Sequence, residues 1–351
     1  MTRKIFRYSL VCLLISMLFS CSTEKYYTED PKENFDMLWE ILDRNYCFFD
    51  EKLPANTTWR DMYDKHVAKI HKKMGVDSLF LVMTQLMAEL KDGHVNLYSN
   101  FDIGRYWNWR DDYPSNYSRE IIDEYLEKDY HIAGSAFYRY LKYNGHTKDS
   151  IGYIRYSSFS GTLSHSNINA MLSRLAFCKG LIIDIRDNGG GNLTTSDVFL
   201  QHFLPERMLT GYISHKKGPG HNDFSDPLPI YVDTLKYGVK WFRPVVVLTN
   251  RGVFSSANDF VMKMKPLKLV TIMGDKTGGG AGLPASSELP IGWAVRYSSS
   301  RMTDANFYNV EFGIEPEIEV SLKDEDKAKK IDTLIEEAIA HINKIYKKKG
   351  Q

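Results

Sequence analysis

Short apolar segments and glycine-rich turns alternate over the second half of the chain. Residues 245–250 are an apolar, β-branched run, which predicts a buried strand of the parallel type. From Ser255 onward, small and apolar residues recur at helical spacing and predict a helix. A second buried strand is predicted over residues 181–186, before the glycine-rich residues 187–192 and another helix. The pattern therefore places Ser255 and these glycines at strand-to-helix turns.

Three amphipathic helices are predicted near the N-terminus. In residues 33–49, apolar side chains recur at i, i+3, i+4 and i+7. Thr58 is the predicted cap of a second helix, and residues 78–90 have the apolar periodicity of a third. Because the connecting loops are short, we predict a small helical N-terminal subdomain over residues 33–92. Periodicity also predicts a C-terminal helix over residues 324–346.

The first twenty residues have the pattern of a bacterial leader. A basic start is followed by an apolar run that is too short to span a membrane comfortably as a mature helix. Residues 18–21 (LFSC) resemble a lipoprotein cleavage box, which implies acylation of Cys21 and stable membrane anchoring. We expect a lipoprotein signal peptide over residues 1–20 and a tether over residues 21–32. The alternative is an ordinary secretion signal.

Ser255 and His94 are the residues whose positions favour catalytic chemistry. A serine at a strand-to-helix turn lies beside the free N–H groups and the positive dipole end of the helix, which favours a nucleophile and its oxyanion. An isolated serine at such a turn more often only caps the helix. His94 lies at a predicted helix-to-strand junction, where a lone histidine is more often structural. The other motifs must therefore decide between these interpretations.

Composition and charge narrow the range of functions that the chain could have. The 351 residues are 43% hydrophobic and 25% charged, which is typical of a globular protein with a sizeable core. The net charge of +1 gives no field that would attract nucleic acid. The glycines of residues 187–192 lack the Gly-Lys-Ser/Thr of a phosphate loop, so an anion nest or an oxyanion contributor fits better.

Three motifs occur in a specific order along the chain. They are LKDGH at residues 90–94, IIDIRDNGGG at residues 182–191, and LTN at residues 248–250 with SSANDF at residues 255–260. Together they resemble the C-terminal processing (tail-specific) and tricorn-core family of serine peptidases, over most of residues 90–322. The lipoprotein start is similar to that of the anchored members found in Bacteroidetes-type bacteria.

The resemblance implies a fold and a division of the chain. It implies a mixed α/β, crotonase-like (ClpP-type) peptidase core, which we place over residues 93–322, with a C-terminal helix over residues 323–351. Residues 93–151 are too short to hold a peptide-binding PDZ domain with its connections. We therefore expect the N-terminal subdomain and the aromatic residues 101–114 to take part in substrate recognition.

The resemblance also implies roles for individual residues. The nucleophile position falls on Ser255, and the oxyanion positions fall on the N–H of Ser256 and on Gly190. The tricorn-like branch uses a histidine in such a DGH motif, assisted by a late glutamate. His94 is then the general base and Glu311 the assisting carboxylate, with Glu288 and Glu315 as alternatives. A neutral imidazole suits this role, because a serine hydroxyl needs an adjacent base.

Two positions depart from the family pattern. Processing peptidases use a lysine where this chain has Gly280, and Lys276 is displaced from that position by four residues. The family acid three residues after the serine is Asn258 here. These departures leave three alternatives open: an inactive binding or scaffold protein, a Ser–Lys peptidase that uses Lys276, and an esterase of small acyl substrates.

The sequence as a whole predicts a serine-type peptidase of the bacterial cell envelope, anchored through lipid on Cys21. It would cleave peptides or unfolded protein tails through an acyl-enzyme on Ser255. Neither a metal nor an organic cofactor is implied, and no nucleic-acid partner is expected. The oligomeric state does not follow from the sequence.

Overall fold

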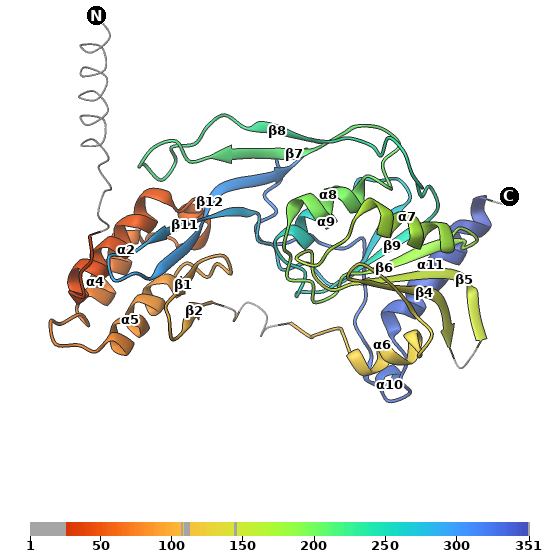
Figure 1. Cartoon of the computed structure of the whole chain (residues 1–351), viewed down its shortest axis with the longest axis horizontal. Helices are drawn as coiled ribbons and strands as arrows, with labels where there is room; N and C mark the ends of the chain where they lie inside the picture. The colour runs from red at the N-terminus through yellow and green to blue at the C-terminus, as the bar shows by residue number, and fades with distance from the viewer. Residues whose placement is uncertain (1–25, 107, 109–112, 144–145, 350–351) are drawn as a thin grey trace, which may run out of the picture.

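Two β-sheets organise the chain. The computed structural model describes residues 26–106, 108, 113–143 and 146–349. Figure 1 shows the N-terminal helices at one end of the molecule and a seven-stranded sheet with its covering helices at the other. The strands β7 and β12 run between the two ends, so each end contains residues from distant parts of the sequence.

The seven-stranded sheet has the order β13-β10-β9-β6-β5-β4-β3. Its central strands are parallel, as predicted for the apolar run at residues 245–250. Every residue of β9 is buried, and alternate residues enter the hydrophobic cores on opposite faces of the sheet. The strands are β3 (His131–Ala133), β4 (Ala136–Tyr143), β5 (His146–Tyr156), β6 (Gly180–Asp184), β9 (Val245–Thr249), β10 (Val270–Gly274) and β13 (Ile318–Glu319).

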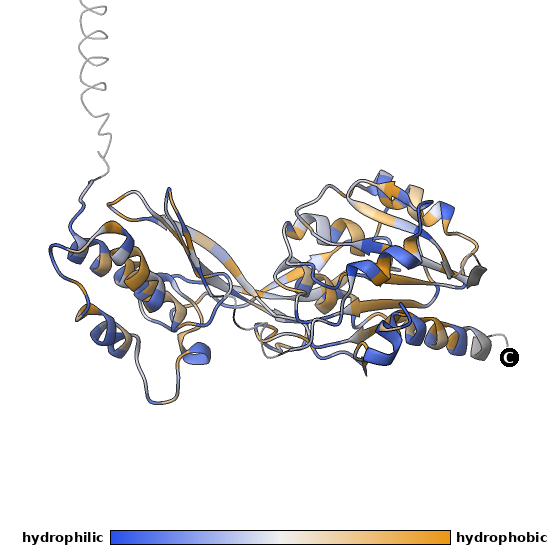
Figure 2. Ribbon diagram, turned by 90° about the horizontal axis from the view of Figure 1, so that it is seen from below, coloured by the Kyte–Doolittle hydropathy of each residue, from blue (hydrophilic) through white to orange (hydrophobic). Residues whose placement is uncertain are grey.

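Helices cover both faces of this sheet, as Figure 2 also shows. One face packs against α7 (His165–Arg174), α8 (Leu193–Leu200) and α9 (Ser256–Met264). The other face packs against α6 (Arg119–Leu126) and α11 (Thr333–Lys349). The predicted mixed α/β core is therefore confirmed.

The six-stranded sheet is antiparallel and joins the two ends of the molecule. The N-terminal helices share a hydrophobic core with residues of its β11–β12 region, including Trp293, Val295 and Tyr297. These helices therefore bury their apolar faces against strands from the C-terminal part of the chain. The helices are α2 (Pro31–Asn45), α3 (Phe49–Lys52), α4 (Trp59–Val67) and α5 (Val76–Ala88). The strands are β1 (Asn96–Tyr98), β2 (Ile103–Arg105), β7 (Met208–His215), β8 (Leu228–Val232), β11 (Gly282–Glu288) and β12 (Ala294–Asp304).

Two predicted helices are interrupted in the structure. The prediction of one helix over residues 33–49 is wrong, because α2 ends at Asn45 and the Cys47 N–H donates to the carbonyl of Ser298 on β12. The prediction of one helix over residues 324–346 is also wrong. The chain forms the short α10 (Asp324–Lys327), then passes through Lys330 at a φ of 58° before α11 begins. The predicted Thr58 cap is confirmed as a capping box.

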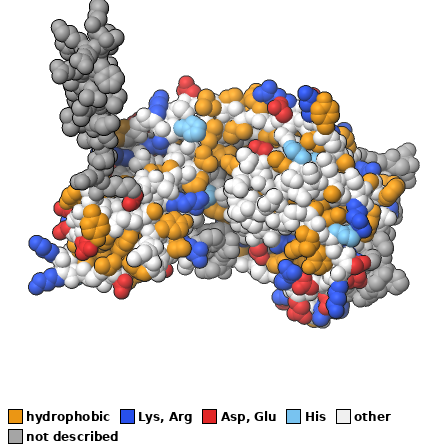
Figure 3. Space-filling view, in the orientation of Figure 1, with side chains coloured by type: hydrophobic (Ala, Val, Ile, Leu, Met, Phe, Trp, Pro, Cys, Tyr) orange, Lys and Arg blue, Asp and Glu red, His pale blue; other side chains and the backbone are white. Residues whose placement is uncertain are grey.

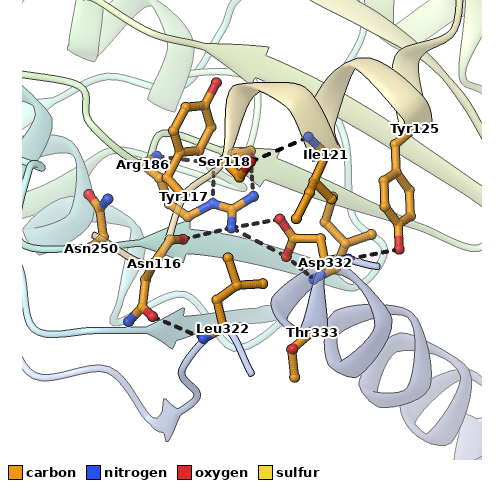
Figure 4. Close-up of polar contacts among 12 residues, drawn as sticks. Asn116, Tyr117, Ser118, Ile121, Tyr125, Arg186, Asn250, Leu322, Asp332 and Thr333 are labelled. Atoms are coloured by element: carbon orange, nitrogen blue, oxygen red, sulfur yellow. Dashed lines mark hydrogen bonds and ion pairs between the residues drawn. The ribbon is translucent and has the colours of Figure 1, made fainter. Parts of the chain in front are cut away.

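A buried arginine ties α11 and the segment before α6 to the end of β6 (Figure 4). Arg186 Nη2 lies 2.6 Å from Asp184 Oδ2, and its Nη1 lies 2.9 Å from Asp332 Oδ2. The same Nη1 donates to the carbonyl of Asn116 at 2.9 Å. Separating any of these groups would leave a buried charge without its partner, which is energetically costly. The cluster therefore holds the chain in place where β6 enters its glycine-rich turn.

Candidate active site

Ser255 occupies a sharp, strained turn between β9 and α9. Its φ of 57° and ψ of −125° are uncommon for a residue with a side chain and cost roughly 1–3 kcal/mol. Neighbouring loops hold this conformation. The Ser255 N–H donates to the Gly279 carbonyl at 2.9 Å, and the Phe254 N–H donates to the Asn188 carbonyl at 3.0 Å. The predicted strand-to-helix turn is thus present.

The glycine-rich turn after β6 lies directly against Ser255. The Asn250 side chain accepts the N–H of Asp187 at 2.8 Å, which joins this turn to the end of β9. Gly190 has a φ of 95°, and a Cβ there would lie 2.6 Å from the Phe254 carbonyl and 2.9 Å from the Ser256 nitrogen. Only glycine therefore allows the turn to approach the start of α9 so closely.

The two predicted oxyanion contributors are adjacent but differ in their hydrogen bonding. Ser256 is the first residue of α9, so its N–H is among those without a partner within the helix. The Gly190 N–H, in contrast, donates to Asn188 Oδ1 at 3.0 Å. Ser256 is therefore the better-placed donor, and Gly190 contributes the close packing of the turn.

His94 faces Ser255 from the loop between α5 and β1. Its Nε2 lies 3.0 Å from Ser255 Oγ, and the residue is 2% exposed. Asp92 Oδ1 accepts the backbone N–H of His94 at 2.7 Å. The other oxygen of Asp92 accepts hydrogen bonds from the hydroxyls of Tyr46 and Ser298, at 3.0 and 2.9 Å. Asp92 thus fixes the loop that carries His94.

The surroundings of His94 keep its imidazole neutral at neutral pH. Burial lowers the pKa of His94 to about 4, and the positive charges of Arg296 and Lys52 add to this effect, while the Asp92 carboxylate opposes it. Neutral imidazole can accept a proton at Nε2. Among the described residues, His94 Nδ1 has no hydrogen-bond partner although it is buried.

Glu311 is bound to a lysine rather than to His94. Lys52 Nζ lies 2.8 Å from Glu311 Oε1, with both side chains at least nine-tenths buried, and the Ala281 N–H donates to Glu311 Oε2 at 2.7 Å. Burial raises the pKa of the Glu311 carboxyl to about 7, although the Lys52 charge lowers it. Lys52 was not predicted from the sequence, because nothing in the local pattern distinguishes it from a surface lysine.

The remaining residues considered from the sequence are exposed or bind groups other than Ser255 and His94. Glu288 is exposed on β11. Lys276 Nζ lies 2.8 Å from Glu315 Oε1, with side chains 30% and 64% exposed. The Asn258 amide accepts the Thr277 hydroxyl at 2.6 Å and donates to the carbonyl of residue 310 at 3.1 Å, so it joins loops next to the site. The two residues that depart from the family pattern, Lys276 and Asn258, are therefore each held by contacts with neighbouring residues.

A cavity of about 300 Å³ opens beside Ser255. Its walls come from the turn after β6, from α9, and from β11 and β12. Figure 3 shows hydrophobic and basic side chains bordering a hollow between the two ends of the molecule. A partly buried hydroxyl–imidazole pair, a helix N-terminus and an adjoining cavity are parts that acyl transfer requires.

The comparisons with known proteins agree with this geometry. The sequence profile of Peptidase family S41 matches residues 150–320, and that of the Tricorn protease C1 domain matches residues 27–88. A candidate peptidase from Parabacteroides merdae with a known crystal structure is 47% identical, covers 90% of this chain and 97% of its own, and superposes with a TM-score of 0.84. The chain belongs to peptidase family S41. It is a serine-type peptidase.

More distant relatives of this S41 peptidase are similar to part of its sequence or to its fold. The carboxy-terminal processing protease CtpB of Bacillus subtilis is 26% identical over 185 residues, which are 52% of this chain and 36% of that protein. The tricorn protease of Thermoplasma acidophilum is 25% identical over 234 residues, which are 62% of this chain and 20% of that protein. The chain thus spans less than two fifths of these curated relatives. Mature CPAF bound to lactacystin shares the fold, with a TM-score of 0.67 at 11% identity.

The Lys52–Glu311 pair gives a stability prediction. Lys52→Met leaves the Glu311 carboxylate buried without its cation, so we expect a loss of about 3 kcal/mol in the free energy of unfolding at pH 8. Lys276→Met, which breaks the partly exposed pair with Glu315, should cost at most about 1 kcal/mol. Urea unfolding of both variants measures the difference.

The double variant Lys52→Met, Glu311→Gln serves as the control for this prediction. It removes the unpaired charge and should regain most of the lost stability. Equal losses in the free energy of unfolding for Lys52→Met and Lys276→Met would show that the buried pair contributes no more to stability than the partly exposed pair.

Proposed function

We propose that this S41 peptidase cleaves peptides or unfolded protein tails through an acyl-enzyme on Ser255, with His94 as general base. The contact of 3.0 Å between His94 Nε2 and Ser255 Oγ supports the proposal most directly. Burial keeps the imidazole in the neutral form that can accept the hydroxyl proton. The strained turn presents the hydroxyl beside the N-terminus of α9.

The reaction follows from these positions. Ser255 Oγ attacks the scissile carbonyl carbon while its proton moves to His94 Nε2, and the negative charge on the carbonyl oxygen is stabilised by the Ser256 N–H. The C–N bond then breaks, and His94 gives its proton to the leaving amine. Water, deprotonated by His94, attacks the ester, and the returning proton restores the Ser255 hydroxyl.

The charges around His94 have distinct roles in this proposal. Asp92 stabilises the imidazolium that forms during the reaction, because its charge raises the pKa of His94. Lys52 acts in the opposite direction, and Glu311 offsets Lys52 through the buried ion pair. Glu311 therefore assists His94 indirectly, by neutralising a nearby cation.

Covalent labelling tests the nucleophile and the base. A fluorophosphonate should form an adduct on Ser255 in the wild type, located by peptide mass mapping, and Ser255→Ala should abolish it. His94→Ala should slow labelling by about 10²–10⁴-fold, because the hydroxyl loses its base. Lys276→Ala, the matched control, should label at the wild-type rate. Dependence on Lys276 would move the mechanism to a Ser–Lys pair, and a folded wild type without any adduct would indicate a dormant site.

The pH dependence tests the electrostatics. Because the pKa of His94 is lowered to about 4, the labelling rate should rise as pH increases through about 4 and should be level by about pH 6, below the range in which Glu311 titrates. Circular dichroism at each pH checks that the protein stays folded. A rising limb centred at the ordinary histidine value of about 6.5 would contradict the proposed surroundings of His94.

We also propose that lipid on Cys21 holds this peptidase at the bacterial cell envelope. The support is the LFSC sequence after a basic and apolar leader. Cys21 lies outside the described residues. None of the helices within the described ranges is long and apolar enough to cross a membrane.

Metabolic labelling with an alkyne fatty acid tests the anchor. The full chain expressed in a bacterium should carry the label and sediment with membranes, and Cys21→Ser should lose both properties, because the acylated sulfur is removed. Cys12→Ser, a matched change within the leader, should keep both. Label retained in Cys21→Ser would refute the anchor.

A further inference from the structure

Arg296 places a positive charge in the cavity beside Ser255. It lies on β12, where Val295 and Tyr297 point into the core shared with the N-terminal helices. The Arg296 side chain therefore lies on the opposite face of the strand and lines the cavity together with Ser255 and Ser256. Its charge is close enough to His94 to lower the pKa of that imidazole.

The guanidinium of Arg296 has no partner among the described residues. In the described part of the chain it makes neither a hydrogen bond nor an ion pair, although the residue is half-buried. The other arginine on the strand, Arg301, in contrast donates to the Cys47 carbonyl and pairs with Glu51. A guanidinium that is partly removed from water and unpaired gains more from binding an anion than a fully hydrated one does.

Among the described residues that line the cavity, none forms an ion pair with this guanidinium. Asp259 also lines it, but Asp259 Oδ2 lies 2.7 Å from Lys263 Nζ and accepts the Ser196 hydroxyl at 3.0 Å. Lys263 Nζ also lies 2.7 Å from Asp197 Oδ1, so it is shared between two carboxylates, and within the described ranges neither of them forms an ion pair with Arg296. The other walls are largely apolar, with contributions from Leu193, Met262, Leu283, Met302 and Val310. The cavity thus combines one unpaired guanidinium with apolar surface, next to Ser255.

We propose that Arg296 binds a carboxylate of the substrate close to the scissile bond. A guanidinium binds a carboxylate through paired, charge-assisted hydrogen bonds, and the apolar walls suit the side chain that accompanies it. The cavity of about 300 Å³ lies at the small end of ligand pockets, so it takes a peptide end or a single side chain rather than a long segment. The carboxylate is either the free C-terminus or an Asp or Glu side chain. This inference rests on the proposed role of Ser255.

Matched peptides test the proposal and separate the two sources. A peptide that the wild type cleaves is prepared with a free acid or an amide at its C-terminus, and with Asp or Asn next to the scissile bond. We expect the acid form that binds Arg296 to have a kcat/KM about tenfold above its neutral counterpart. A preference for the free C-terminus identifies the chain end, and a preference for Asp over Asn identifies a side chain.

Variants assign the preference to Arg296. Arg296→Gln should bring the acid-to-neutral ratio close to one, and Arg296→Lys should keep part of it, because a point charge replaces the paired hydrogen bonds. Arg174→Gln removes an exposed arginine on α7, outside the cavity lining, and should keep the full ratio. A ratio unchanged by Arg296→Gln, or a wild type without any preference, would overturn the proposal.

A binding measurement separates a failure of Arg296 from a failure of Ser255. The probe is a hexapeptide of alanine and leucine, labelled with fluorescein at its N-terminus, as free acid or amide and with or without an aspartate. Fluorescence anisotropy gives its Kd for Ser255→Ala and for Ser255→Ala combined with Arg296→Gln. Tighter binding of a carboxylate form, lost in the double variant, supports the role of Arg296 even when no cleavage occurs. Equal Kd values for acid and neutral probes refute it.

Discussion

The positive φ of Ser255 can persist only because neighbouring turns are hydrogen-bonded around it. The turn after β6 accepts the N–H of Phe254 through Asn188, and the turn after β10 accepts the N–H of Ser255 through Gly279. Parallel strands bring the ends of β6, β9 and β10 to one edge of the sheet, so these turns meet there. The strain is therefore balanced by the sheet, and it directs the hydroxyl away from the backbone toward His94.

A second constraint is electrostatic. His94 is buried close to two cations, which favours the neutral imidazole and therefore proton acceptance from Ser255. The two cations differ in their own surroundings, because Lys52 is paired with Glu311, whereas Arg296 has no counter-ion within the described ranges. The unpaired guanidinium of Arg296 favours an anion in the cavity, whether it is a substrate carboxylate or the oxygen of the tetrahedral intermediate.

The sequence predicted which helices and strands form better than it predicted where they end and which distant residues they contact. Residues 245–250 were predicted as a buried strand because the run begins with four apolar residues, Val245 to Leu248. The structure confirms this, since every residue of β9 is buried. Ser255 and His94 are 161 residues apart, and only the ordered motifs indicated that they meet. Lys52 and Arg296 could not be recognised, because their roles depend on burial and on distant neighbours. The end of α2 at Asn45 likewise depends on a tertiary hydrogen bond from Cys47 to β12.

The reactive pair is divided between the two sheets. His94 precedes β1, which pairs with β12 so that Asn96 lies opposite Arg296, and Ser298 of β12 binds Asp92. The proposed base and the carboxylate-binding candidate therefore belong to one sheet, while Ser255 and Ser256 lie at the start of α9, which follows a strand of the other. A displacement of about 1 Å between catalytic groups can cost roughly 10²-fold in rate. In the proposed mechanism, the contact of the N-terminal helices with β11 and β12 therefore bears on catalysis, because it fixes the sheet that holds His94.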